Sequence, residues 1–352
     1  MPVTSSDIKR QAVALGFDLC GIARADEFPE LQSLRAWLDR GYAGEMGYLA
    51  RSADRRMDVR RVLPCARSVI VAAMVYNTDR PYSTETTAAG TAEISRYAWG
   101  EDYHRVIGDR LERLLAWMRA ECAEPFDATW YVDTGPVQER VYGQHAGLGW
   151  IGKNTCLINP ELGSWLFLSE IIVSLPLDPD EAGTDRCGSC TLCLEACPTG
   201  ALVEPRVLDA TRCISYLTIE LKGTIPETDR DGVGDHVYGC DICQEVCPFN
   251  MRPAVSTREE WLPRREFDQP ALVDLWRASD ERLHAALRGS AMARAKPTGL
   301  RRNVAVAIGN SGHPDLAGVF DEADDAPPVS PSKQDPMVQE HVDWAKRKLR
   351  SL

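Results

Sequence analysis

The chain has 352 residues, of which 44% are apolar and 26% charged, and it carries a formal net charge of −12. This length can bury a sizeable core in two or three domains, and the composition is that of a globular protein. No apolar run approaches the ~20 residues of a membrane span, and the acidic total argues against nucleic-acid binding over the whole surface while leaving room for a local basic patch.

The first part of the chain alternates expected helices and strands. The N-terminus has no basic segment followed by an apolar one, so no signal peptide is predicted and we expect a cytoplasmic protein. The stretch 53–61 is densely basic and has two readings, a solvated loop or a contact with an anion. Apolar patterns predict helices over 5–16, 28–40 and 102–122 and strands over 17–23 and 68–76.

The stretch 129–177 contains the first candidate site. Residues 129–133 are a predicted strand, which leaves the Asp133 carboxylate at its end, before a helix expected to begin at Pro136. An aspartate in such a place is often only a turn or capping residue. Residues 146–156 are rich in glycine, which indicates close approach of the backbone to a ligand or to another segment. Residues 165–177 are apolar and fit either a strand or a buried helix.

Eight cysteines between residues 187 and 247 dominate the middle of the chain. The first run, which ends at Pro198, has the spacing C-x2-C-x2-C-x3-C-P of bacterial two-cluster ferredoxins. The second run ends in the same way at Pro248, but 26 residues separate its first two cysteines instead of two. Because the fourth cysteine of each run ligates the other cluster, the spacing predicts two [4Fe–4S] clusters. One takes Cys187, Cys190, Cys193 and Cys247, and the other takes Cys197, Cys213, Cys240 and Cys243.

Structural zinc is the main alternative for these cysteines, because CxxC pairs also suit a tetrahedral zinc site. The two C-x3-C-P endings favour iron–sulfur clusters over zinc. Disulfides fit less well, because adjacent CxxC pairs inside one loop are awkward to bridge.

The last part of the chain is predicted to be mainly helical. Residues 209–221 are expected to form a helix that carries Cys213, followed by a polar, glycine-rich insertion. Residues 321–331 form an acidic, proline-rich loop of unassigned role. The three further predicted helical stretches span 270–288, 299–310 and 337–349.

From the residues alone, the chain is an iron–sulfur redox protein with a bound organic cofactor or substrate at a glycine-rich site. It has no P-loop and no G-x-G-x-x-G in a βαβ setting. It also lacks the D-x-H-x-x-G pattern by which some cobalamin proteins supply a lower histidine ligand.

A family resemblance extends this interpretation. Together with the cysteine pattern, several motifs of the chain resemble the epoxyqueuosine reductase family in the same order, from about residue 10 to residue 310. These motifs are Arg55-Arg56, Leu63-Pro64, Ser68-Val-Ile, Asp133-Thr-Gly-Pro-Val-Gln-Glu-Arg140, Ala146-Gly-Leu-Gly-Trp-Ile-Gly-Lys-Asn-Thr-Cys-Leu157, Leu162-Gly-Ser-Trp165, Gly299-Leu-Arg-Arg-Asn303 and Ala307-Ile-Gly-Asn310.

The resemblance implies an enzyme of queuosine biosynthesis that reduces the epoxide of epoxyqueuosine at the tRNA wobble position. Electrons from an external reductant of the flavodoxin or ferredoxin type would pass through the two clusters to cobalamin, which has no lower histidine ligand. The implied fold class is α+β, and we expect a monomer. Its parts are an α/β cobalamin-binding domain (1–177), a ferredoxin-like two-cluster domain (178–255) and a helical, HEAT-like region that binds tRNA (256–352).

The resemblance also assigns roles to single residues. Asp133 is implied as the proton donor, and we expect its apolar neighbours Trp130 and Val132 to raise its pKa toward the working pH. The implied cobalamin contacts are Arg56, Ala98, Gln138, Leu157, Leu168, Ser215, Asp241 and Ile242. The basic candidates for tRNA are Lys222, Arg294, Lys296, Arg301 and Arg302, for which ordinary solvated surface is the alternative.

Two other functions remain open on the sequence. A reductive dehalogenase-like enzyme also couples two clusters to cobalamin, but we would expect an export signal and no basic C-terminal helices. A non-catalytic electron carrier, or an iron–sulfur module that binds RNA, would leave Asp133 and the glycine-rich block without a purpose. The six histidines form no metal pair, and core or surface roles are the default for His104 and His145.

Overall fold

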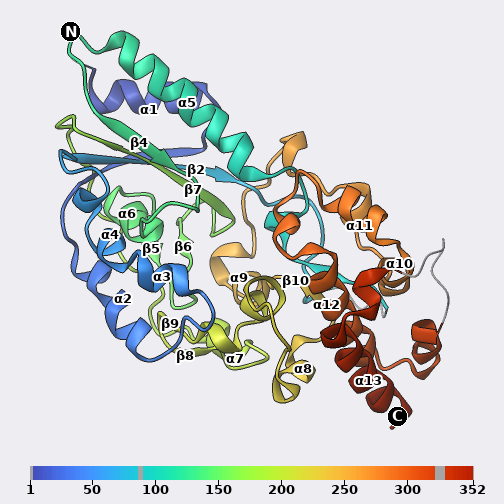
Figure 1. Cartoon of the computed structure of the whole chain (residues 1–352). Coiled ribbons are helices and arrows are strands. Elements are labelled where there is room, and N and C mark those ends of the chain that lie inside the picture. Colours follow the sequence, from blue (N-terminus) through green and yellow to red (C-terminus); the bar gives the residue numbers. More distant parts are fainter. Residues whose placement is uncertain (1–2, 86–89, 322–329, 352) are drawn as a thin grey trace.

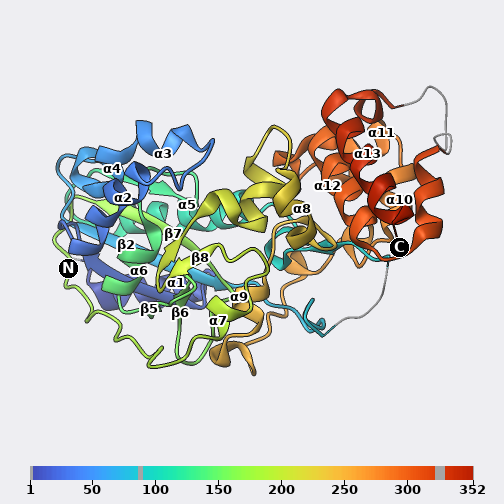
Figure 2. The same ribbon diagram turned by 90° about the horizontal axis from the view of Figure 1, so that it is seen from below.

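The computed structural model describes residues 3–85, 90–321 and 330–351 (Figure 1). A body built around a β-sheet lies at one end and a group of C-terminal helices at the other, with the yellow segments that follow the first cysteine run between them (Figure 2). The acidic loop predicted over 321–331 falls almost wholly outside the described residues. Within the described ranges, no helix is long and apolar enough to span a membrane.

The body contains a four-stranded sheet in which all neighbouring strands are antiparallel. Its order is β1 (Leu19–Arg24), β2 (Ser68–Val75), β7 (Leu166–Val173) and β4 (Ala128–Tyr131). The three strand predictions are confirmed, and the apolar stretch 165–177 proves to contain a strand. Every residue of β2 is buried, as expected for a central strand with both faces covered.

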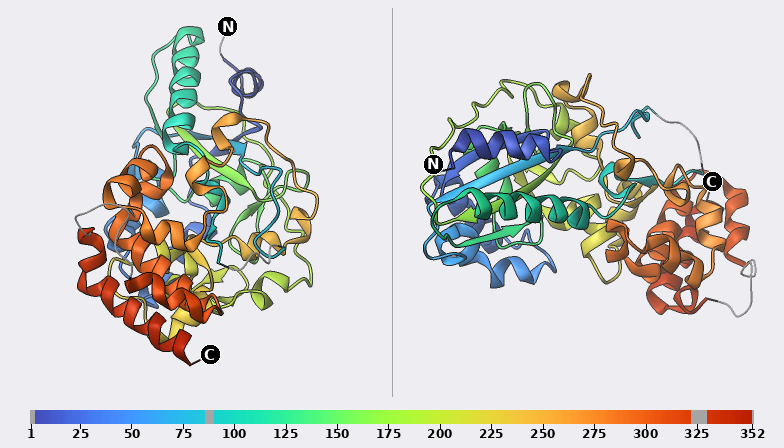
Figure 3. Two further views of the ribbon diagram at one scale, coloured as in Figure 1. Left: turned by 90° about the vertical axis from the view of Figure 1, so that its right-hand side faces the viewer. Right: turned by 90° about the horizontal axis from the view of Figure 1, so that it is seen from above.

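Helices cover both faces of this sheet. One face packs against α1 (Ser5–Ala14) and α5 (Tyr103–Glu121), which lie side by side (Figure 3). The other packs against α6 (Glu139–His145), with α2 (Pro29–Asp39) and α4 (Ala53–Met57) beyond it. Side chains alternate along a strand, and in β7 Phe167, Ile171 and Val173 join the α1/α5 side. Leu168 and Ile172 join the α6 side, so Glu170 between them faces α6 as well.

The helix predicted from Pro136 is confirmed in kind but begins later, at Glu139. The reason is the turn that follows β4, in which Asp133 has a positive φ of 58°. The bends continue through residue 137, and the N-cap Gln138 has a non-helical backbone (φ −95°, ψ 81°), so helical backbone starts only at Glu139. This delay places the first turn of α6 beside Asp133.

Four short elements complete the first half of the chain. The strand β3 pairs in parallel with β10 (His236–Tyr238), and β5 pairs antiparallel with β6. The short elements are α3 (Gly47–Arg51), β3 (Glu93–Ile94), β5 (Trp150–Ile151) and β6 (Leu157–Ile158). The β3–β10 pairing joins the body to the segment between the cysteine runs.

The cysteine segment consists of short elements. The helix predicted over 209–221 is broken at Cys213: a 3₁₀ turn (Ala210–Arg212) precedes this extended residue, and a helical segment that contains a π-helical turn (Tyr216–Glu220) follows it. The polar insertion that follows contains the helix α8. The named elements are α7 (Leu192–Glu195), β8 (Leu202–Glu204), β9 (Val207–Leu208), α8 (Glu227–Val233) and α9 (Ile242–Glu245).

The C-terminal helices confirm the three helical predictions there, although residues 270–288 divide into two helices at Ser279, which caps the second. Helix α12 packs against α13, and the core around it also contains Ile94 and Val237. The C-terminal helices thus share a core with segments from the first two thirds of the chain. Their bounds are α10 (Leu272–Arg277), α11 (Asp280–Leu287), α12 (Lys296–Asn310) and α13 (Pro336–Arg350).

Candidate active site

A cavity of about 470 Å³ lies where the three parts of the molecule meet. Tyr76 and Leu168 line it from one end of the sheet, Ser215 from the cysteine segment, and Arg294 from the turn before α12. Pockets of about 300–1,000 Å³ are typical of sites for small molecules and cofactors. The cavity therefore has the size and position of an active site.

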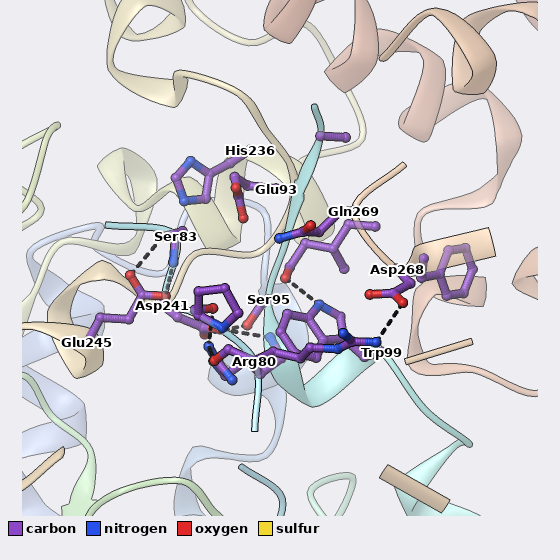
Figure 4. A pocket seen from close by; sticks show the side chains of 15 residues that line it. Arg80, Ser83, Glu93, Ser95, Trp99, His236, Asp241, Glu245, Asp268 and Gln269 are labelled. Atoms are coloured by element: carbon purple, nitrogen blue, oxygen red, sulfur yellow. Dashed lines mark hydrogen bonds and ion pairs between the residues drawn. The ribbon is translucent and has the colours of Figure 1, made fainter. Parts of the chain in front are cut away.

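A second pocket lies behind the wall of this cavity and measures only about 30 Å³ (Figure 4). The Asp241 carboxylate lines both, and it accepts hydrogen bonds from Ser95 Oγ (2.5 Å) and from the Arg96 N–H (2.7 Å). Ser83 Oγ donates to Glu245, which also lines the small pocket (2.7 Å). Such a volume holds one or two waters, so the larger cavity is the candidate site.

Asp133 lines the large cavity from the turn after β4. Its side chain is 48% exposed, and its own N–H donates to Glu139 Oε1 at 2.6 Å. A non-glycine residue at φ 58° is uncommon and is found often at functional sites. The hydrogen bond to Glu139 holds the strained turn in place and directs the Asp133 carboxylate into the cavity.

His104 in the first turn of α5 is the nearest base to Asp133. Its Nδ1 lies 2.7 Å from Asp102 Oδ1, and its Nε2 lies 3.4 Å from Asp133 Oδ2. Burial disfavours the imidazolium, but the two carboxylates outweigh it and raise the pKa of His104 to about 9. The sequence analysis expected only a core or surface role for His104 and so missed its contact with Asp133. The available signal was its position two residues after an aspartate that caps a helix.

The pKa of Asp133 is shifted in the opposite direction from the one predicted. Burial acts to raise it, but His104 and Tyr103 hold the pKa of Asp133 below its usual range. The expectation from its apolar neighbours Trp130 and Val132 is therefore wrong, because the imidazolium stabilises the carboxylate. At neutral pH the pair carries its proton on His104.

Two more carboxyls lie beside this pair. Glu139 lines the cavity, and burial together with Asp133 raises its pKa to about 8. Glu170 is completely buried, and neither of its oxygens has a hydrogen-bond partner among the described residues. Burial, reinforced by Glu139 and Asp133, raises the pKa of Glu170 well above its usual value. The sequence analysis missed Glu170, although a single carboxylate inside an apolar strand was a usable signal.

The structure brings the eight cysteines into two groups of four. Burial and the nearby thiols of Cys187 and Cys193 raise the pKa of Cys247 to about 11, and Cys193 in turn neighbours Cys190. In the other group Cys213 neighbours Cys197, and Cys243 neighbours both Cys240 and Cys213. No three Cys, His, Asp or Glu side chains converge on one point in the described part of the chain.

Only the second group of cysteines faces the cavity. Cys197, Cys213, Cys240 and Cys243 line it, whereas no cysteine of the first group does. A further thiol, Cys156, also lines it and hydrogen-bonds to Cys243, which lowers the pKa of Cys156. Electrons that enter at the first group would reach the cavity through the second.

The residues implied as cobalamin contacts divide into two sets. Leu168, Ser215, Asp241 and Ile242 line the cavity. The other four do not line it and make contacts within the protein. Arg56 Nη1 donates to Val137 O (3.0 Å), and Gln138 Nε2 donates to Leu31 O (2.9 Å). Leu157 packs against Gly143, and Ala98 belongs to the C-terminal core.

The glycines of the block 146–156 lie against other backbone segments of the protein, and most of the block does not line the cavity. A Cβ on Gly149 would lie 2.1 Å from the carbonyl oxygen of Ile158, and one on Gly183 would lie 1.7 Å from that of Gly149. Of the block, only residues 154–156 line the cavity. The glycines therefore serve chain packing, and the ligand site lies next to the block.

The basic residues predicted to contact tRNA fall into two groups, one near the cavity and one buried in the C-terminal core. Lys222, Arg294 and Lys296 lie close together. Burial is the main cause that lowers the pKa of Lys222, and the positive charges of Arg294 and Lys296 lower it further. Arg294 lines the cavity and pairs with Glu220 (2.8 Å). These three residues, which we call the basic rim, lie close to the cavity.

Arg301 and Arg302 are wrong as phosphate contacts, because both side chains are buried in the C-terminal core. Arg301 Nη1 donates to Trp276 O (2.5 Å) and Nε to Ser332 Oγ (2.6 Å). Arg302 donates to the carbonyls of Leu217, Leu221 and Gly223 at 2.6–2.8 Å. They fasten α12 to its neighbours, which is a structural role.

Two family models match the chain: "4Fe-4S double cluster binding domain" over residues 186–250 and "Epoxyqueuosine reductase QueG, DUF1730" over residues 56–134. The chain is 46% identical to the epoxyqueuosine reductase of Gloeobacter violaceus, over 89% of the chain and 98% of that relative. It is 38% identical to that of Escherichia coli, over 96% and 87%.

Solved structures of the same enzyme have a similar fold. An epoxyqueuosine reductase crystallised with an epoxyqueuosine-modified tRNA-Tyr stem loop has a TM-score of 0.84 at 31% identity, over 98% of this chain and 89% of that one. The enzyme of Streptococcus thermophilus has a TM-score of 0.84 at 27% identity, over 99% and 90%.

Proposed function

The chain belongs to the epoxyqueuosine reductase family, and we propose from this premise how its cavity reduces epoxyqueuosine in tRNA. The observation that carries the proposal is that one cavity is lined both by the second cysteine group and by the Asp133–His104 pair. Electrons and protons can thus reach the same point. The mixed α+β fold contains a [4Fe–4S] double-cluster domain, to which we assign the two cysteine groups as ligands.

We assign cobalamin to this cavity. Four of the implied contacts line it, namely Leu168, Ser215, Asp241 and Ile242, and the last two belong to the loop between Cys240 and Cys243. In the described part of the chain, His104 alone among histidines lines the cavity, and it already contacts Asp102 and Asp133. These residues fit a corrin held without a lower histidine ligand. When bound, cobalamin would supply a reduced metal centre that transfers electrons to the epoxide.

The proton chemistry falls to this chain's own residues. Opening of the epoxide leaves an alkoxide, which needs a proton before its oxygen can depart. Asp133 lies at the cavity with the protonated His104 behind it, so the pair can deliver that proton through the Asp133 carboxylate. Arg140 also lines the cavity and adds positive charge near the developing alkoxide.

We assign tRNA binding to the basic rim and to the HEAT-like C-terminal helices of the third part, residues 256–352. A related enzyme binds an epoxyqueuosine-modified tRNA stem loop. Phosphate contacts position RNA, and a modified base splayed out of the loop can enter a cavity. The ring of Tyr48 lies 6.0 Å from the Arg294 guanidinium and offers a stacking surface there. The reductant is of the flavodoxin or ferredoxin type, and the enzyme acts as a monomer.

The test uses anaerobically reconstituted protein with cobalamin, a chemical reductant and tRNA that contains epoxyqueuosine. Nucleoside analysis should find queuosine only when both cofactors are present. The Asp133→Asn variant should keep its iron content and its cobalamin spectrum but lose turnover by 10²–10⁴-fold, the usual contribution of a general acid. Full activity in that variant would remove Asp133 from the mechanism.

A further inference from the structure

The reaction needs more protons than the Asp133–His104 pair holds. Conversion of the epoxide to the alkene of queuosine breaks both C–O bonds, forms a C=C bond and releases the oxygen as water. Two electrons arrive from the reductant through the clusters, and two protons must arrive as well. The pair carries one proton, on His104. A second proton must come from another group or from solvent, which a filled cavity excludes.

Glu139 and Glu170 are two further carboxyls near Asp133: Glu139 lines the cavity, and Glu170 is wholly buried. Glu139 Oε1 accepts the Asp133 N–H at 2.6 Å, which leaves Oε2 free to carry a proton. Strand register places Glu170 opposite Tyr131, two residues before Asp133, on the face that α6 covers. Glu170 is wholly enclosed and has no hydrogen-bond partner for either oxygen in the described part of the chain. An ionised carboxylate in such a place would be severely unfavourable, so Glu170 holds a proton.

We propose that Glu139 and Glu170 form a proton store beside the cavity that recharges Asp133 after its first donation, so that one binding event supplies both protons. The claim rests on Asp133 being the proton donor, as proposed above. In the second step a proton leaves the Glu139 carboxyl for the Asp133 carboxylate, which passes it to the departing hydroxyl. Glu170 has no direct hydrogen bond to Glu139, so its proton returns to Glu139 through a water between the two carboxyls, and solvent refills the store after product release.

The charges around the store agree with this direction of transfer. Asp133 faces Glu139 as a like charge and the protonated Glu170 is neutral, whereas Arg140 and Arg56 face Glu139 as opposite charges. Burial and Asp133 together raise the pKa of Glu139 to about 8, so it is protonated at neutral pH. After the first donation His104 has lost its proton and Asp133 is a carboxylate again, so Glu139 is the nearest protonated carboxyl. The two arginines remain charged and cannot supply a proton.

The test compares Glu139→Gln and Glu170→Gln with Glu161→Gln, an exposed control outside the cavity. In single-turnover reactions at pH 7 we expect losses of roughly 10²-fold for Glu139→Gln and a smaller loss for Glu170→Gln, with no change for the control. Wild-type activity should fall as pH rises through about 8, and this limb should be absent in Glu139→Gln. Wild-type rates in both variants would overturn the proposal.

A second measurement needs neither cobalamin nor turnover. Because the folded pKa of Glu139 is raised from 4.5 to about 8, the wild type should lose stability to urea as pH rises from 4.5 through 8. Glu139→Gln should lack that loss, and each glutamine variant should lose an infrared band of a protonated carboxyl. If these bands are absent from the wild type, the store does not exist. If Asp133→Asn is fully active, the proposed role of Asp133 fails, and the store fails with it. If Asp133→Asn is inactive but Glu139→Gln and Glu170→Gln react at the wild-type rate, only the proton store is contradicted.

Discussion

At the scale of single residues, the contact between His104 and Asp133 determines the charge of the candidate donor. A carboxyl among apolar side chains would be expected to hold its proton at neutral pH. The imidazolium 3.4 Å away reverses that expectation and takes the proton itself. Residues 104 and 133 lie on different elements, α5 and the turn after β4. Their pairing is therefore a property of the packed molecule.

We predict that His104→Gln lowers turnover by 10²–10³-fold, because Asp133 then has no neighbouring cation to supply its proton. The folded pKa of His104 is raised from 6.5 to about 9, so its pairing stabilises the protein fully below pH 6.5 and the contribution disappears as pH rises through 9. Urea titrations should show the variant to be less stable than the wild type at pH 6 and equal to it above pH 9.

The matched control for this prediction is His145→Gln. His145 lies on α6 and contacts Glu30 (3.2 Å) and the ring of Phe28, outside the lining of the cavity. It should leave turnover and its pH dependence unchanged. An equal loss in both variants would show that His104 acts through general stability and not through the proton.

At the scale of elements, α12 illustrates how burial changes the role of a basic residue. Two arginines that are adjacent in sequence, Arg301 and Arg302, lie at 0% and 1% exposure, while Lys296 at the start of the same helix is exposed. Helix α12 packs against α10, α13 and β10, so its surface is almost entirely covered. A guanidinium in this position can satisfy several carbonyls at once, which a shorter polar side chain could not.

We predict that Arg302→Met destabilises the protein by about 3 kcal/mol, since three carbonyls lose their donor inside the core. The measurement is urea unfolding at pH 7. The control is Arg347→Met on α13, whose side chain is 62% exposed and 3.7 Å from Glu227, and it should cost less than about 1 kcal/mol. Similar losses for both arginines would contradict a structural role for Arg302.

At the scale of the whole molecule, the cavity exists only because three distant stretches of the chain converge. The sheet end contributes the proton groups, the cysteine segment contributes the second group of thiols, and the turn before α12 contributes Arg294. The basic rim adds positive charge beside the cavity in a protein with a net charge of −12. This arrangement favours an anionic substrate at the cavity while the rest of the surface repels it.

We predict that the double variant Lys222→Gln/Lys296→Gln binds the anticodon stem loop more weakly. The slope of log K against log salt concentration should fall by roughly one for each lysine, because each contact with a phosphate releases counterions. The measurement is a fluorescence titration at several salt concentrations. The control is Arg113→Gln/Arg119→Gln on the exposed side of α5, which should leave the slope unchanged. An unchanged slope in the lysine variant would place the RNA elsewhere.

The amino-acid sequence by itself determined the features that depend on short-range spacing. The cysteine runs indicated two groups of ligands, and apolar patterns located three of the four strands of the sheet and the long helix α5, because each pattern is complete within a few residues. The sequence could not predict the extended conformation of Cys213 or the late start of α6. A cluster-binding segment and a strained turn override local helical preference there.

Tertiary structure alone decided which groups interact. Burial separated Arg301 and Arg302 from the basic rim, although local charge could not distinguish them. Strand pairing placed Glu170 next to the turn that carries Asp133, and helix packing brought His104 to the same point. Charge states follow from such neighbours and from exclusion of water, and both arise only when segments far apart in sequence pack together.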